Sequence, residues 1–174
     1  MSNWYHIPMT TITVLAGVFQ SIFISLGVGS STLAILNFFT AIKDGTIDAV
    51  ERNMMGIVYI VLRVAMVGIL FTTVVLLAPT ITADIMQLSV VSLAQLTIIA
   101  VLFINATLMT ARLMPSKYGP GIQAGSWYTL GGIAALQLQG VTAYSYVDFA
   151  TGYIAMMLLA VVLVLVAMNW QRGR

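Results

Sequence analysis

One charged side chain lies within a long apolar segment of this sequence, and its position requires a chemical explanation. Arg63 lies inside the run Met54–Ala78, which has no other charged residue. An arginine at the centre of a membrane span costs roughly 2.5–3.5 kcal/mol on insertion scales, so such a residue is expected to have a partner. Arginine stays protonated and offers five N–H donors. We therefore predict that Arg63 binds an anion or neutral hydrogen-bond acceptors.

The other reactive residues form no catalytic or metal-binding set. The chain has no cysteine and a single histidine, His6, which excludes disulfides, thiolate nucleophiles and bis-histidine haem ligation by one chain. Asp44, Asp48 and Glu51 cluster in one polar segment beside Lys and Arg, as on a solvated or protein-binding surface. We therefore predict no catalytic residue, no metal site and no cofactor.

Composition places these residues in a membrane protein. Of the 174 residues, 60% are hydrophobic and only 7% are charged. A soluble domain has about a quarter charged residues, so this chain has too few to cover a surface in water. The alternating hydrophobicity of a β-barrel is absent. The expected fold class is an all-α, polytopic membrane bundle, forming a single domain over residues 1–174, in contact with membrane lipids and without a nucleic-acid partner.

Five transmembrane helices are predicted, at about residues 8–42, 46–78, 84–111, 126–144 and 149–170. Thr46 is the expected N-cap of the second helix, and Pro79 is expected to end that helix because it cannot extend the hydrogen-bond ladder. The segment 112–127 contains Pro115, Pro120 and several glycines, which predicts a loop. The fourth helix is short and weakly apolar, so we expect its neighbours to shield it from lipid.

The basic residues predict an orientation. Six of the seven Lys and Arg residues fall in the first connection, the third connection and the C-terminal tail, which share one side of a five-helix bundle. The opposite side carries Asp84 and Asp148 but no Lys or Arg. The positive-inside rule then places the N-terminus outside and the C-terminus in the cytoplasm, in the inner membrane of a prokaryote. Trp127 and Tyr153 are expected at the inner and outer interfaces.

Hydroxyl and amide side chains occur on other helices near the expected depth of Arg63, which is close to the membrane midplane. The predicted polar layer consists of Arg63, Tyr59, Ser31, Thr32, Asn105 and Gln137. Three roles for Arg63 remain open. Its hydrogen bonds are satisfied within this layer, or its side chain reaches toward the cytoplasm. Alternatively, it pairs with an acid from a partner subunit or cofactor, or it lines an anion or proton pathway. The lack of a carboxylate at depth counts against a proton pathway.

The first helix carries a small residue at every fourth position: Gly17, Ser21, Ser25 and Gly29. Such a stripe lets another helix approach closely, and we predict that it is a helix-packing surface. The alternative is a narrow substrate path lined by Ser25, Ser30, Ser31 and Thr32.

Three functions follow as hypotheses. The first is a non-catalytic integral-membrane subunit or accessory protein of a larger complex, packing through the first helix and the Arg63 layer against other membrane subunits or a second copy. The second is a small oligomeric transporter or channel for an ion or small solute. The third is a quinone- or haem-associated membrane component, which the single histidine makes the weakest.

Overall fold

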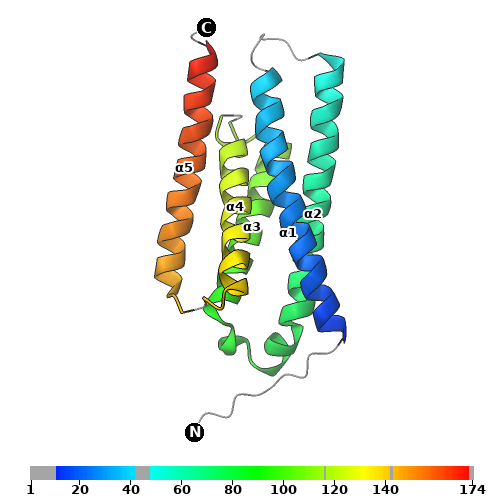
Figure 1. Ribbon diagram of the computed structural model, residues 1–174, viewed down its shortest axis with the longest axis vertical. Coiled ribbons are helices and arrows are strands. Elements are labelled where there is room, and N and C mark those ends of the chain that lie inside the picture. Colours follow the sequence, from blue (N-terminus) through cyan, green and yellow to red (C-terminus); the bar gives the residue numbers. More distant parts are fainter. Residues whose placement is uncertain (1–10, 42–47, 116, 142, 173–174) are drawn as a thin grey trace.

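The chain folds into a bundle of helices that alternate in direction. The computed structural model describes residues 11–41, 48–115, 117–141 and 143–172 (Figure 1). The helices are α1 (Thr11–Ala41), α2 (Ala49–Ala83), α3 (Val90–Thr110), α4 (Gly119–Leu138) and α5 (Tyr146–Arg172), with a 3-10 turn, η1 (Ile85–Gln87), before α3. No strand occurs within these ranges, so the expected all-helical class is confirmed for the described part of the chain.

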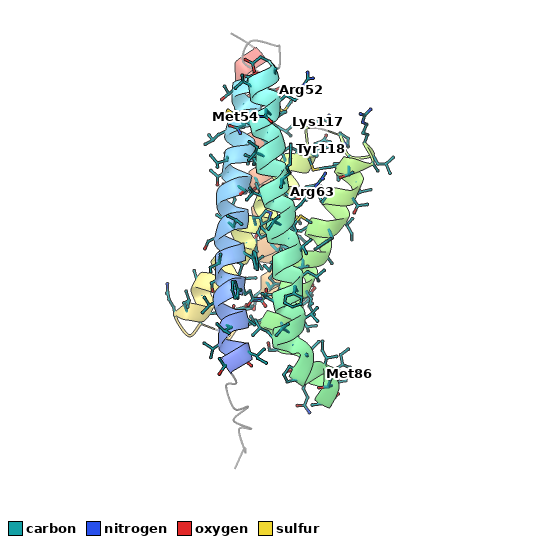
Figure 2. The ribbon with its side chains drawn as sticks, turned by 90° about the vertical axis from the view of Figure 1, so that its right-hand side faces the viewer. Arg52, Met54, Arg63, Met86, Lys117 and Tyr118 are labelled. Atoms are coloured by element: carbon teal, nitrogen blue, oxygen red, sulfur yellow. The ribbon has the colours of Figure 1, made fainter. Side chains whose placement is uncertain are left out.

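Four of the helices, α1, α2, α3 and α5, are long and apolar enough to cross a membrane. The chain therefore has the elements of a multi-pass membrane protein. The basic residues Arg52 and Lys117 lie toward one end of the bundle, and Met86 lies at the opposite end (Figure 2).

Helix α4 differs from the other four because it lies among them. It packs against α1, α3 and α5. Ala124, Ser126, Trp127 and Leu130 are completely buried along it. Its weakly apolar sequence is thus compatible with a membrane protein, since neighbouring helices cover the small and polar residues of its first half, Gly121, Gln123, Gly125 and Ser126.

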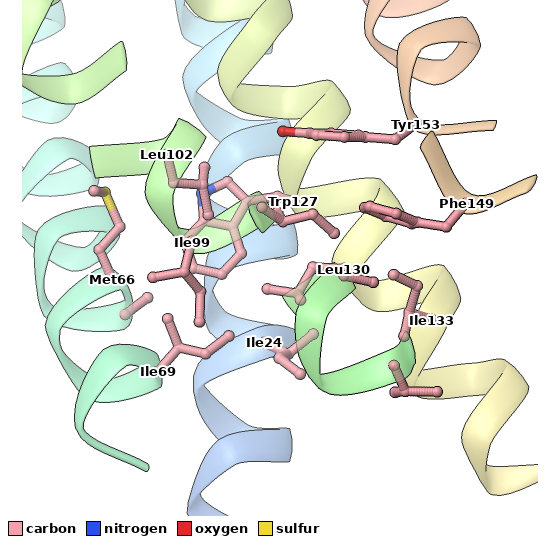
Figure 3. Close-up of a cluster of buried hydrophobic side chains, with 14 of the residues drawn as sticks. Ile24, Met66, Ile69, Ile99, Leu102, Trp127, Leu130, Ile133, Phe149 and Tyr153 are labelled. Carbon is pink, nitrogen blue, oxygen red and sulfur yellow. The ribbon is translucent and has the colours of Figure 1, made fainter. Parts of the chain in front are cut away.

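The hydrophobic core draws on all five helices (Figure 3). Trp127 lies at its centre with no exposed surface, and Tyr153 is also buried and shares a 2.8 Å hydrogen bond with Ser126. The expectation that Trp127 and Tyr153 mark the membrane interfaces is wrong. Both rings face the bundle interior, because the small residues around them on α1 and α4 leave room for large side chains.

The start of α4 also differs from its predicted position at residue 126. The helix begins at Gly119, and Pro120 stands in its first turn. Proline suits that place because the first N–H groups of a helix have no intrahelical acceptor. The connection is therefore short, and half of the predicted 112–127 loop is helix.

Helix α2 is longer than predicted at its C-terminal end, where it continues through Pro79 to Ala83. Membrane helices tolerate such a proline better than soluble ones do. Beyond it, the Thr82 hydroxyl donates to the carbonyl of Ala78 at a distance of 2.8 Å. At the other end, Asp48 is the N-cap. Its side chain accepts from the Glu51 amide at 2.7 Å, and Glu51 accepts from the Asp48 amide at 3.1 Å. Thr46, the predicted cap, lies outside the described residues.

Candidate functional site

Arg63 projects from α2 with no partner among the residues that the structure describes. Its side chain is exposed, and no described residue forms a hydrogen bond, an ion pair or a ring contact with it. Figure 2 shows Arg63 between α2 and the helix to its right, below Lys117 and Tyr118. The guanidinium is therefore free to bind a group from outside the chain.

A cavity of about 310 Å³ opens beside Arg63, at the junction of α1, α2, α3 and the start of α4. Most of its wall is apolar, and the polar side chains on it come from all four helices. The lining residues are Ser31, Ala34, Ile35, Phe38, Tyr59, Leu62, Arg63, Met66, Ala106, Met109, Thr110, Pro120 and Gln123. The volume is at the lower end of the range of small-molecule pockets, which is roughly 300–1,000 Å³.

The cavity lies near one end of the bundle. Its α3 residues, Ala106, Met109 and Thr110, belong to the last two turns of that helix, and Pro120 belongs to the first turn of α4. A helix of 21 residues such as α3 is about 30 Å long, the thickness of the hydrocarbon core. If the two ends of α3 lie at the two membrane boundaries, the level of Arg63 is nearer to one boundary than the midplane position expected from the sequence.

Three of the six residues of the predicted polar layer meet at this cavity: Ser31, Tyr59 and Arg63. Tyr59 stands one helical turn from Arg63 and is half-exposed, and Ser31 is buried. The structure thus assembles the α1 and α2 members of the layer around an open space.

The other three members lie elsewhere. Thr32 shares a 2.8 Å hydrogen bond with Tyr128. Gln137, near the C-terminal end of α4, accepts from Gln95 at 3.2 Å. The placement of Gln137 in the Arg63 layer is wrong, because it assumed that α4 begins at residue 126. With the start at Gly119, the first turns of α4 reach the Arg63 level and its last turns do not.

Asn105 lies behind the cavity wall. Its side-chain Nδ2 donates to the carbonyl of Gly119 and to Oε1 of Gln123, at 3.1 Å in both cases. The bond to Gln123 links α3 to a buried side chain of α4. The Asn105 Oδ1 atom is buried without a hydrogen-bond partner. Gln123 is the polar residue at this site that sequence reasoning missed, since it falls in the segment predicted as a loop.

The cavity has a positive electrostatic character. The described carboxylates lie away from it: Asp48 and Glu51 cap α2, and Asp84 and Asp148 stand at the opposite end of the bundle. Lys117, just before α4, lies 4.8 Å from the centre of the Tyr118 ring. With no acid on its wall, the cavity can attract an anion.

In the described part of the chain, most of the small-residue stripe on α1 is not covered by another helix. Ser21, Ser25 and Gly29 are exposed, and a Cβ atom added to Gly17 or Gly29 would meet nothing within 4 Å. The Ser21 hydroxyl donates to the carbonyl of Gly17 at 3.1 Å, so this polar group is satisfied within the helix. The stripe remains a prediction for contact with another molecule. The alternative path is not assembled, because Ser30 and Ser31 are buried while Ser25 is exposed.

No known family model, curated protein or solved structure matches this chain. Its possible chemistry follows from the site itself. Over the ranges that the structure describes, no group of three His, Asp or Glu side chains is close enough to hold a metal ion. At the cavity, Arg63 can bind an anion, Tyr59 can donate a hydrogen bond, and the apolar wall can cover a hydrocarbon segment.

Proposed function

We propose that this protein is a non-catalytic integral-membrane subunit or accessory protein of a larger membrane assembly. The observation that carries the proposal is the stripe of Gly17, Ser21, Ser25 and Gly29 on α1, of which Ser21, Ser25 and Gly29 are exposed. Helices in lipid associate through small residues that let two backbones approach closely. Here the fold of the chain leaves that surface free, so a helix of another subunit or of a second copy can pack on it.

The proposed arrangement in the membrane has five crossings. Helix α4 is antiparallel to α1, α3 and α5 and packs against all three (Figure 1), which supports a fifth crossing despite its weak hydropathy. Arg52, Arg112 and Lys117 then lie on the cytoplasmic side of a prokaryotic inner membrane, and the N-terminus lies outside.

The proposal is tested by substituting Gly29 with a large side chain. Gly29→Leu places that side chain at the C-terminal end of the stripe, where nothing lies within 4 Å of the added Cβ. Gly152→Leu on α5 is the matched control, since Gly152 is also exposed with open space around it. Native mass spectrometry of the protein extracted in mild detergent reports its partners.

We expect wild type and Gly152→Leu to be recovered with a stoichiometric partner or as an oligomer, and Gly29→Leu to be recovered as a lone chain. Recovery of all three proteins as monomers contradicts the proposal, as does an assembly that survives Gly29→Leu unchanged.

A small oligomeric transporter or channel is the second candidate, and the cavity with its unpaired Arg63 favours it. Within one chain, the fully buried Trp127, Ile98 and Leu102 fill the interior beyond the cavity, so a path would have to run between copies. Flux of a small anion into liposomes that depends on Arg63 would support transport over an accessory role. The quinone- or haem-associated role is weaker, since His6 is the only histidine.

A further inference from the structure

The cavity beside Arg63 combines features that a lipid molecule needs in one place. It has an apolar wall formed by Ala34, Ile35, Phe38, Leu62 and Ala106, and a cation at its edge. We propose that this cavity binds an anionic phospholipid, whose phosphate contacts Arg63 and whose acyl chain lies against the apolar wall. The site is distinct from the α1 stripe and does not depend on the proposed accessory role.

The charge on the cavity favours a phosphate. Arg63 is exposed and has no acidic partner among the described residues, and the guanidinium fork binds phosphate oxygens through two parallel N–H bonds. Tyr59, one turn away on the same wall, supplies a hydroxyl donor at the same level. An anion bound here removes the cost of an unpaired guanidinium next to hydrocarbon.

The position of the cavity favours a lipid over a partner's carboxylate. It faces the last two turns of α3 and the first turn of α4, where the headgroups of one leaflet begin if α3 spans the hydrocarbon core. Arg52 and Lys117 lie toward the same end of the bundle, and basic pockets between helices on that side of a membrane are typical phospholipid headgroup sites. A carboxylate on a partner helix would engage Arg63 but would leave the apolar wall uncovered.

The test is native mass spectrometry of the purified protein titrated with phosphatidylglycerol or with phosphatidylcholine of the same acyl chains. Four variants are compared with wild type. Arg63→Gln removes the charge, and Arg52→Gln on the same helix is its control because Arg52 is exposed and outside the cavity. Ala106→Phe fills the cavity and leaves Arg63 in place, and Ala100→Phe is its control because Ala100 is exposed on the same helix.

We expect wild type, Arg52→Gln and Ala100→Phe to bind phosphatidylglycerol in preference to phosphatidylcholine. Arg63→Gln should lose roughly fivefold in affinity for phosphatidylglycerol, as expected for one cation near the membrane surface. Ala106→Phe should weaken binding of both lipids, since it occupies the space of the acyl chain. Glycerol phosphate, which has the charge without the chain, should not displace the lipid.

An equal loss of phosphatidylglycerol affinity in Arg63→Gln and Arg52→Gln would overturn the proposal, because it would indicate a diffuse attraction of the lipid to the basic end of the bundle. Lipid binding that is unchanged in Ala106→Phe would also overturn it, as would displacement by glycerol phosphate. A co-purifying polypeptide that is lost only in Arg63→Gln would assign the cation to a protein partner instead. If Arg63→Gln does not fold, the comparison of Ala106→Phe with Ala100→Phe still tests the proposal.

Discussion

Gly27 and Trp127 show how one contact between two residues holds α1 against α4. Trp127 is completely buried, and its ring lies against the backbone of Gly27 so closely that any Cβ atom there would overlap it. The Trp127 ring thus fills the space that a side chain at position 27 would occupy. Its Nε1 atom is buried without a hydrogen-bond partner, so the position is held by packing of the ring.

Gly27→Val is therefore expected to destabilise the protein by about 1–3 kcal/mol, the usual cost of overpacking a filled core. The measurement is the thermal unfolding midpoint of the purified protein in detergent. Gly152→Val is the control, since Gly152 is exposed, lies outside the α1 stripe, and its added Cβ meets nothing within 4 Å. Equal midpoints for the two variants would refute the role given to Gly27.

Helix α4 is held against α5 by two glycines four residues apart. A Cβ on Gly121 would lie 2.7 Å from the Cα of Val161, and one on Gly125 would lie 2.9 Å from the Cα of Met157. The backbones of α4 and α5 therefore approach closely through a Gly-x-x-x-Gly pattern. Sequence reasoning identified a small-residue stripe on α1 and missed this one, because it assigned residues 112–127 to a loop.

Gly121→Leu and Gly125→Leu should each push α5 away from α4. We expect faster hydrogen exchange of α5 amides, equivalent to roughly 1–3 kcal/mol less protection. Gly132→Leu, on the same helix but with open space around its added Cβ, should leave α5 exchange unchanged. Similar exchange in all three variants would show that the α4–α5 contact does not depend on the glycines.

At the scale of the whole molecule, the alternation of helix directions places the basic residues of the described connections at one end of the bundle. Arg52, Arg112 and Lys117 stand in or next to connections at one end, together with Asp48 and Glu51, whereas Asp84 and Asp148 stand at the other end without a basic residue. This separation exists only if α4 runs the full length of the bundle. The crossing of α4 therefore decides the membrane topology.

The natural chain has no cysteine, so single cysteines can report that topology. In spheroplasts, Asp84→Cys and Ser145→Cys should react with a membrane-impermeant maleimide, because they are expected outside. Arg52→Cys and Lys117→Cys should react only after permeabilisation. If Lys117→Cys and Ser145→Cys react from the same side, α4 does not cross the membrane and the five-span topology is wrong.

Several features of this protein were accessible from sequence because they depend on local chemistry. Long apolar runs form helices in lipid since each backbone group must be satisfied within its own segment. The five helices, the separation of charges and the lack of a carboxylate near Arg63 follow from the residues in each run. The start of α4 was missed for a local reason as well, because Pro120 was interpreted as a helix breaker although it stands in a first turn.

Which faces of the helices meet was decided only by the tertiary structure. A membrane helix that is apolar on all sides has no hydrophobic periodicity to show which side turns inward. The burial of Trp127, the pairing of Asn105 with Gln123 and the exposure of the α1 stripe depend on how helices far apart in sequence fit together. For the same reason, the sequence showed that Arg63 needs a partner, and the packing of α1, α2, α3 and α4 left an apolar cavity beside it.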